Sequence, residues 1–239
     1  MVQLNVNPSI KPSDHEDILQ GLPTNLESNE PPLESDLHRE QIDLLIRLLK
    51  YWWQDRTDFY ISGNLTVYYN QKQLKTRDFR GPDIFIVLGA EQKERRSWVI
   101  WEEGGKYPDV VIELLSDSTA SVDRGLKKNL YQSVWRVPNY FWFHPGTCEF
   151  KGLRLVAGQY EELTPNEDGR LWSDQLNLFL GIDKRQLRWY DENGHLIPLP
   201  EEQERQAKEQ ERQAKELAEQ RVQQLEEVLR SQGIDPDAL

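Results

Sequence analysis

Two acidic residues stand in apolar segments that are otherwise typical of β-strands. Glu113 lies within residues 108–115, "PDVVIELL", and Asp83 opens residues 83–88, "DIFIVL". Successive residues of a strand point to opposite faces, so Glu113 shares its face with the residues two positions away on either side. A charged side chain among apolar neighbours is costly to bury unless it is paired or binds a cation. Glu113 therefore needs a partner from elsewhere in the chain.

The expected partner of Glu113 is Asp83 rather than Asp109. Asp109 lies on the same strand as Glu113, roughly 13 Å away, which is too far for one ion with oxygen bonds of about 2.0–2.6 Å. If residues 83–88 pair antiparallel with residues 108–113, Asp83 lies opposite Glu113. Cross-strand neighbours are about 4.5–5.5 Å apart, a spacing at which two carboxylates can hold one divalent metal ion.

A lysine follows on the next predicted helix, which is expected to span about residues 118–135. On this helix Asp123, Lys127 and Tyr131 are four residues apart and share one side. The Lys127 side chain can extend back to the end of the strand that contains Glu113. There its ammonium group would stabilise charge on a phosphate or help to orient and deprotonate water. Two carboxylates, a divalent ion and a lysine are a known arrangement for phosphodiester hydrolysis.

Each of these residues also has a structural interpretation. Asp83 and Asp109 follow prolines, and a Pro-Asp turn that starts a strand is a common local device; for Asp109 this interpretation is favoured. Glu113 could form a structural ion pair with Lys127. Other basic residues could contact phosphates or could be ordinary loop charges: Lys72, Lys75, Arg77, Arg80, Lys93, Arg95 and Arg96.

The remaining elements predict an α/β domain. A helix over residues 36–53, N-capped by Ser35, has apolar residues at helical spacing. Residues 58–62 and 65–69 flank Gly63-Asn64, a dipeptide typical of a two-residue hairpin turn. Further strands are expected in the segments 98–101, 139–143, 152–156, 175–180 and 187–190, and Asn193-Gly194 marks a last hairpin.

The composition divides the chain into unequal parts. The 239 residues carry a formal charge of −12 and one cysteine, Cys148, so no intrachain disulfide is expected and a reducing cytoplasm is the predicted location. Residues 34–199 hold 22 basic and 25 acidic groups with all eight Trp and all nine Tyr, and they should form the folded domain. Residues 1–33 are polar and expected to be largely irregular. We see no signal peptide and no apolar run long enough for a membrane span, so no membrane partner is expected.

The C-terminal segment differs in kind. Residues 204–210, "ERQAKEQ", repeat at 211–217 as "ERQAKEL", and a charged helix is expected over residues 200–232, before a tail at 233–239. Apolar residues continue with 4-3-4 spacing: Ala218, Val222, Leu225 and Leu229. Two interpretations stay open. The segment is either a solvated single helix supported by Glu–Lys pairs or a short coiled coil that associates two or more chains.

Three segments carry a resemblance to a known family: "PDVVIELLSDST", "DRGLKKNLY" and "RVPNYFWFHP". They resemble a large bacterial family, abundant in cyanobacteria, that is related to the restriction endonucleases of the PD-(D/E)XK nuclease superfamily. The resemblance extends over about residues 34–199. It implies an α/β fold with a restriction-endonuclease-like core, in which helices flank a mixed central sheet.

The resemblance also implies a site for Mg²⁺ (or Mn²⁺). Asp83 and Glu113 match the two acidic ligands, and Leu114 matches the residue whose backbone carbonyl also faces the metal. Leu115 stands where the superfamily has its lysine. Lys127 takes the place of a lysine that is shifted to the following helix.

Further positions complete the set of candidate site residues. Glu34 and His38 match a family pattern at the first helix, and Asp109 and Tyr131 lie beside the main candidates in the sequence pattern. His144 stands where relatives often have Asp, at a turn outside the predicted site.

These features predict a metal-dependent endonuclease that hydrolyses DNA, with Asp83 and Glu113 as metal ligands and Lys127 as catalytic base or charge stabiliser. Nucleases of this type often cut two strands as dimers, and the C-terminal heptads offer a means of homo-oligomerisation. The alternative is a catalytically silent nuclease-like fold that acts as a binding or assembly module through its C-terminal helix. The acidic net charge slightly favours this alternative, and the intact Asp–Glu–Lys set favours the enzyme.

Overall fold

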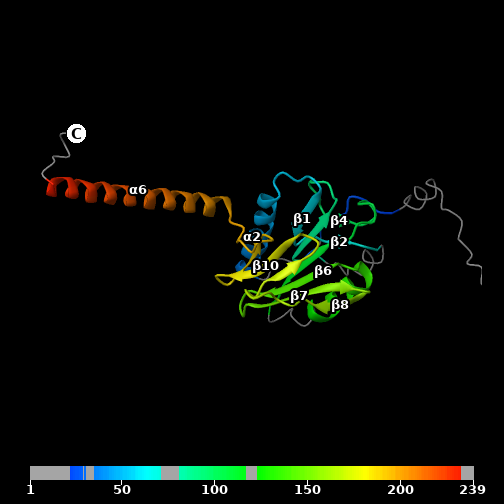
Figure 1. The fold of residues 1–239 in the computed structure, drawn as a ribbon. Coiled ribbons are helices and arrows are strands. Elements are labelled where there is room, and N and C mark those ends of the chain that lie inside the picture. The colour runs from blue at the N-terminus through cyan, green and yellow to red at the C-terminus, as the bar shows by residue number, and fades with distance from the viewer. Residues whose placement is uncertain (1–21, 29, 31–34, 71–80, 117–122, 233–239) are drawn as a thin grey trace, which may run out of the picture. The chain divides into compact units, whose positions relative to one another are not determined.

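The computed structural model describes residues 22–28, 30, 35–70, 81–116 and 123–232. Their strands form sheets of six, three and two strands (Figure 1). The largest sheet is mixed, because β5 and β6 are parallel while its other neighbours are antiparallel. The predicted α/β class with a mixed central sheet is thereby confirmed. In spatial order its strands are β1 (Phe59–Gly63), β3 (Ile84–Leu88), β5 (Val110–Leu114), β6 (Asn139–His144), β7 (Glu149–Val156) and β8 (Gln159–Glu162).

The register between β3 and β5 agrees with the sequence prediction. Ile84 lies opposite Ile112 and Ile86 lies opposite Val110. One residue further along this antiparallel pair, Asp83 comes opposite Glu113. The two strands are rich in β-branched residues and are almost completely buried, which suits a central position in the sheet.

The predicted hairpin at Gly63-Asn64 is wrong. β1 pairs with β3, with Gly63 opposite Ile84, and the Asn64 N–H continues this ladder by donating to the Asp83 carbonyl at 3.1 Å. Asn64 has a φ of 48°, so the chain does turn here. The turn directs the following residues away from β1 into another sheet, because the more apolar β3 takes the position beside β1.

Two small sheets complete the strands. β2 (Val67–Tyr68) pairs in parallel with β4 (Trp98–Val99), which confirms a short strand within residues 98–101. β9 (Leu171–Ser173), β10 (Leu178–Asp183) and β11 (Gln186–Tyr190) form an antiparallel sheet in the order β11–β10–β9. The turn at Asn193-Gly194 returns the chain to an isolated antiparallel bridge between Tyr190 and Leu196.

The first helix, α2 (Asp36–Trp52), positions one side of the candidate site. Ser35 is its N-cap and accepts the His38 N–H, as expected. The helix packs against β1 and β11 (Figure 1) through a buried face that includes Leu45, Leu48 and Leu49. A buried apolar face of this kind is the main source of stability for a helix of this length.

The opposite face of the central sheet is covered by aromatic residues. β5, the residue after it and β6 contribute to one buried cluster: Val111, Leu115, Tyr140 and Trp142. The helix that follows β5 adds Tyr131 and Trp135 to the same cluster. The predicted alternation of β5 is thereby confirmed, since the residues on the Glu113 side face this helix.

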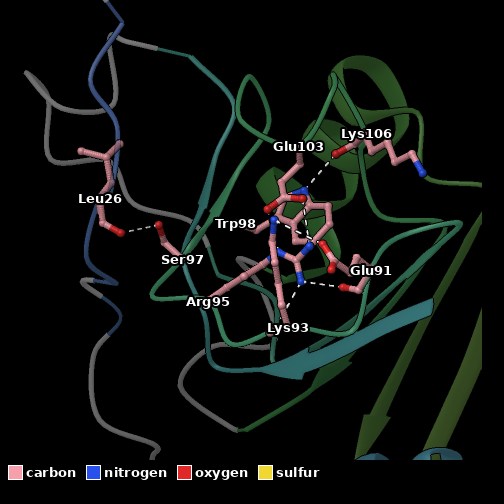
Figure 2. Close-up of polar contacts among 8 residues, drawn as sticks. All are labelled: Leu26, Glu91, Lys93, Arg95, Ser97, Trp98, Glu103 and Lys106. Carbon is pink, nitrogen blue, oxygen red and sulfur yellow. Dashed lines mark hydrogen bonds and ion pairs between the residues drawn. The ribbon is translucent and has the colours of Figure 1, made fainter. Parts of the chain in front are cut away.

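Residues 22–28 contain no helix or strand, yet they lie against β2 and β4. The Ser97 hydroxyl donates to the Leu26 carbonyl at 2.6 Å (Figure 2). The Tyr68 hydroxyl donates to the backbone carbonyl of Glu27 at 2.8 Å. These bonds attach the N-terminal segment to the side chains of the β2–β4 region.

Arg95 has a structural role rather than a solvent-facing one (Figure 2). Its side chain is 4% exposed and makes two hydrogen bonds to the Glu103 carboxylate, at 2.6 and 2.9 Å. A third bond joins it to the Glu91 carbonyl. The guanidinium group also lies over the rings of Tyr60 and Trp98, 4.4 and 4.8 Å from their centroids. The Arg95 side chain therefore stabilises the fold and is not placed to contact phosphates.

The chain divides into two compact units, residues 1–197 and 198–239. The second unit contains α6 (Pro200–Ser231), a helix with no buried residue. Its ion pairs include Lys208–Glu204 and Arg212–Glu216, each four residues apart. Four of its apolar residues are more than half exposed: Leu217, Val222, Leu225 and Val228.

No helix in the described ranges has both the length and the apolar character that a membrane span requires.

Gly63 provides a test of the packing that positions Asp83. A Cβ at this position would lie 2.5 Å from Ile42 Cγ2 and 2.7 Å from the backbone carbonyl of Asp83. Because backbone cannot move aside like a side chain, Gly63→Ala should lower the free energy of unfolding by about 1–3 kcal/mol, measured by urea denaturation.

The matched control is Gly125→Ala in the helix after β5. A Cβ there would meet no heavy atom within 4 Å, so the substitution should be neutral or stabilise the protein by up to about 1 kcal/mol. Equal destabilisation by the two substitutions would contradict the packing argument.

Candidate active site

Glu113 forms the buried centre of the site. Its side chain is 0% exposed. The Lys127 ammonium group donates to Oε2 at 3.0 Å, and the Tyr131 hydroxyl donates to Oε1 at 2.5 Å. The Lys127 side chain is itself only 17% exposed. The ion pair is therefore largely shielded from water. Two charges attract each other more strongly in such a buried place than at an exposed surface.

The charge on Glu113 is costly in this position. Burial raises the pKa of the Glu113 carboxyl to about 7, from an ordinary value of 4.5. The positive charge of Lys127 lowers this pKa, the negative charge of Asp83 raises it, and the hydrogen bonds from Tyr131 and Lys127 lower it. Additional positive charge at this point would favour the ionised carboxylate.

Asp83 lies beside Glu113, as the strand register requires. One oxygen of its carboxylate accepts the Leu114 N–H at 2.7 Å, and its own N–H donates to Glu113 Oε2 at 3.3 Å. Each acidic side chain is thus bonded to the backbone of the other strand. These reciprocal bonds bring both carboxylates to the same end of the β3–β5 pair.

The helix after β5 brings Lys127 and Tyr131 to Glu113. It consists of η1 (Asp123–Lys127), α5 (Lys128–Leu130) and η2 (Tyr131–Trp135), of which η1 and η2 are π-helical. Lys127 ends the first π-helical turn and Tyr131 begins the second. Short π-helical turns are uncommon and are found frequently at functional sites. The predicted common side of Lys127 and Tyr131 is confirmed by their shared contact.

The backbone carbonyl of Leu114 lies against His38 on α2. His38 Nε2 is 3.2 Å from Leu114 O, and His38 Nδ1 is 2.8 Å from Ser35 Oγ. A carbonyl oxygen can only accept, so Nε2 carries the hydrogen of the first bond. Ser35 therefore holds the imidazole ring and the ring holds the carbonyl, which connects the start of α2 to the end of β5.

Other residues predicted from the sequence lie away from Glu113 or are not among the residues that the structure describes. The Asp109 carboxylate accepts the Leu88 N–H at 2.7 Å, at the opposite end of β5 from Glu113, and burial raises its pKa. His144 Nδ1 accepts the N–H groups of Gly146 and Thr147 and closes the turn after β6. Glu34, residues 71–80 with their four basic side chains, and the side chain of Asp123 lie outside the described part.

Two contacts of α2 were not predicted from the sequence. The sequence predicts Ser35 only as an N-cap, although it also bonds the ring of His38. The Gln41 side chain exchanges two hydrogen bonds with the Leu187 backbone, both of 2.9 Å, and joins α2 to β11. The Ser-x-x-His spacing is a signal for the first contact. The second has no local signal, because Leu187 lies 146 residues away.

The donor set is suitable for a hard divalent cation. The carboxylates of Asp83 and Glu113 and the carbonyl of Leu114 supply oxygen ligands, which Mg²⁺ and Mn²⁺ prefer. Among the residues that the structure describes, no three or more His, Cys, Asp or Glu side chains are grouped for metal binding. The suitability of this site for a divalent cation therefore depends on two carboxylates and one backbone carbonyl. The Lys127 ammonium group now supplies positive charge at Glu113 Oε2.

A comparison with models of protein families identifies the family of this chain. The model of the family Uma2, described as "Putative restriction endonuclease", matches residues 25–188. Among solved structures, the chain is similar to one from Anabaena variabilis titled "a putative nuclease belonging to DUF820". That similarity has 14% sequence identity and a TM-score of 0.44, and it covers 68% of this chain and 89% of the other. No curated protein matches the sequence.

The raised pKa of Glu113 predicts a pH-dependent stability in metal-free buffer. The folded protein keeps this proton up to about pH 7, whereas the ordinary value of 4.5 applies to the unfolded chain. The folded state therefore binds more protons in this interval, and stability falls as the pH rises. We expect a contribution of about 3 kcal/mol that is fully present below pH 4.5 and lost above pH 7.

Urea denaturation of the wild type and of Glu113→Gln across this interval measures the effect. The glutamine has the same shape and does not titrate, while other titrating groups such as Asp109 are common to both proteins. The free energy of unfolding of the wild type minus that of the variant should fall with rising pH. Parallel profiles would show that Glu113 titrates normally.

Proposed function

Because the chain belongs to the Uma2 family, we propose that it is a metal-dependent endonuclease that hydrolyses the phosphodiester bonds of DNA. The observation that carries this proposal is the convergence of Asp83, Glu113 and Lys127 at one end of the β3–β5 pair. This set is also what the sequence predicted. Phosphodiester hydrolysis needs positive charge for the phosphate and an activated water molecule, and these residues can provide for both.

Asp83, Glu113 and the Leu114 carbonyl would hold Mg²⁺ or Mn²⁺. When bound, such an ion supplies charge for the phosphate oxygens and lowers the pKa of a bound water molecule. His38 orients the Leu114 carbonyl, and Tyr131 orients the Glu113 carboxylate. Their role is to keep the oxygen donors in position.

The role of Lys127 is to stabilise the negative charge that develops on the phosphate. Its ion pair with Glu113 requires the protonated form of the lysine, and a protonated lysine stabilises negative charge. A neutral lysine could instead remove a proton from water. The contact with Glu113 favours the first of these roles. Lys127 would exchange its contact with Glu113 for one with the substrate when a metal ion takes over the carboxylate.

One observation favours the alternative of a catalytically silent binding or assembly module. Both oxygens of Glu113 already have partners from the protein, Lys127 and Tyr131, so the set is satisfied as a structural ion pair. The exposed apolar residues of α6 would then provide the interaction surface, through homo-oligomerisation as a coiled coil. Catalysis and assembly are compatible, and a dimer joined by α6 could place two sites on one duplex.

Plasmid nicking by the purified protein in Mg²⁺ tests the proposed hydrolysis. Asp83→Asn, Glu113→Gln and Lys127→Met should each reduce the rate by at least about 100-fold, because each removes a ligand or a charge that acts on the reacting phosphate. Chelation of the metal should have the same effect.

The control is Lys128→Met, which removes an equal charge from the neighbouring position on the same helix. It should keep most of the activity. A rate that is the same in the wild type and in all four variants would point to a contaminating nuclease and would exclude this site as its source.

Metal binding has a second readout that does not depend on activity. Titration with Mg²⁺ should raise the melting temperature of the wild type, with stabilisation of about 2.7 kcal/mol at a concentration 100 times the dissociation constant. Glu113→Gln should lose most of this effect because one charged ligand is missing. An absent response, or an equal one in both proteins, would contradict the metal site and support the silent module.

A further inference from the structure

The turn between β10 and β11 places two basic residues in a backbone conformation that does not suit them. Asp183 pairs with Gln186, so Lys184 and Arg185 form the whole loop. Their φ angles are 47° and 68°. Positive φ at both central residues is the mark of a type I′ turn, in which Asn-Gly is the favoured pair. Side chains such as Lys and Arg have a steric cost at these angles.

The turn is attached to the end of β6. The Arg185 guanidinium group donates to the Gly146 carbonyl at 2.6 Å. A groove of about 310 Å³ lies here, lined on one side by this turn and by Pro145 and Gly146. Its other side consists of residues from the beginning of α2, including Leu37 and Glu40.

This groove is on the active-site edge of the central sheet. β5 and β6 run parallel, with Leu114 opposite Phe143, so the residues after β6 lie at the edge that carries Glu113. The α2 residues of the groove flank His38, which contacts the Leu114 carbonyl. The two bonds between Gln41 and the Leu187 backbone hold β11, and thus the turn, against the same helix.

The charges on the turn face solvent. Lys184 and Arg185 are both exposed, and within the described residues neither forms an ion pair with a carboxylate. They differ in this from Arg95, which is buried against Glu103. Glu40 also lines the groove, so the lining has two basic residues and one acidic residue.

We propose that the Lys184–Arg185 turn contacts the phosphate backbone of duplex DNA beside the scissile phosphate. The inference rests on the proposed function. Nucleic-acid enzymes hold their substrate mainly through Lys and Arg contacts to phosphates that flank the reacting one. A two-residue turn keeps two cations together at a fixed place on the edge of the site. The unfavourable backbone angles are explained if the charges, rather than the turn itself, are needed there.

The double variant Lys184→Asn/Arg185→Gly tests this proposal. Binding of the full chain to a short fluorescent DNA duplex is measured by anisotropy in EDTA, where no metal-dependent cleavage occurs, over a range of NaCl concentrations. Loss of two phosphate contacts should weaken binding and reduce the slope of log K against log salt concentration by about 2. The melting temperature should change little, because the better fit of Asn-Gly to the turn offsets the loss of the Arg185 bond to the Gly146 carbonyl.

The matched control is Arg136→Gly/Arg154→Asn. Both arginines are exposed, and Arg136 also has a positive φ, of 54°. Arg154 lies opposite Asn139, at the other end of β6 from Gly146. The control therefore removes the same charge from the opposite sheet edge, and its salt slope should equal that of the wild type.

The outcomes separate this inference from the proposed hydrolysis. A lower slope in the turn variant alone supports the phosphate contact, even if the wild type fails to nick plasmid and the hydrolysis proposal falls. Equal slopes in the turn variant and the wild type overturn the inference. An equal reduction of the slope in the turn variant and in the control also overturns the inference, because it would indicate only a general effect of charge. A wild type that does not bind the duplex overturns it as well.

Discussion

Glu113 places a carboxylate inside a sheet whose neighbouring residues are apolar, and ionisation at such a place is costly. Three donor groups reduce that cost. The N–H of Asp83 comes from β3, and the ammonium and hydroxyl groups of Lys127 and Tyr131 come from the helix after β5. Removal of one donor would leave a buried acceptor without its partner, which is more costly than the loss of an exposed bond. The strand register and the position of the helix are therefore both connected to this one side chain.

The same interactions allow two states of the site. With Lys127 on the carboxylate, both oxygens of Glu113 have partners from the protein. Under the proposed function, a divalent ion held by the carboxylates would take the place of Lys127 at Glu113 and leave the ammonium group available for a substrate phosphate. The repulsion between Asp83 and Glu113, which contributes to the raised pKa of Glu113, is the feature that would make the second state favourable.

Aromatic packing keeps these donors in place. Tyr131 lies against Trp135 and Tyr140, with ring centroids 5.0 and 5.2 Å away, so its hydroxyl is fixed by the core and not by a loop. On the other face of the sheet, Ser35 and His38 connect α2 to the Leu114 carbonyl. The candidate ligands are thus supported from both faces of the sheet, as a preorganised site requires.

Much of this site follows from local sequence patterns. The alternation along β5 predicted the side on which Glu113 points, equal strand lengths predicted its register with Asp83, and helical spacing predicted that Lys127 and Tyr131 lie together. These properties depend on backbone geometry that is the same in every protein, so a single chain is enough to infer them.

Tertiary structure decided which elements became neighbours. Gly63-Asn64 has the local pattern of a hairpin, yet β1 pairs with β3, because burial of both faces of β3 outweighs the preference of the turn. The contact of His38 with Leu114 joins residues 76 positions apart, and no local pattern specifies such a pair. The sequence by itself determined which residues could do chemistry and which way each one points along its own element. The packing of α2, the sheet and the helix after β5 decided which of them meet, because that choice depends on the apolar surface that the whole chain can bury.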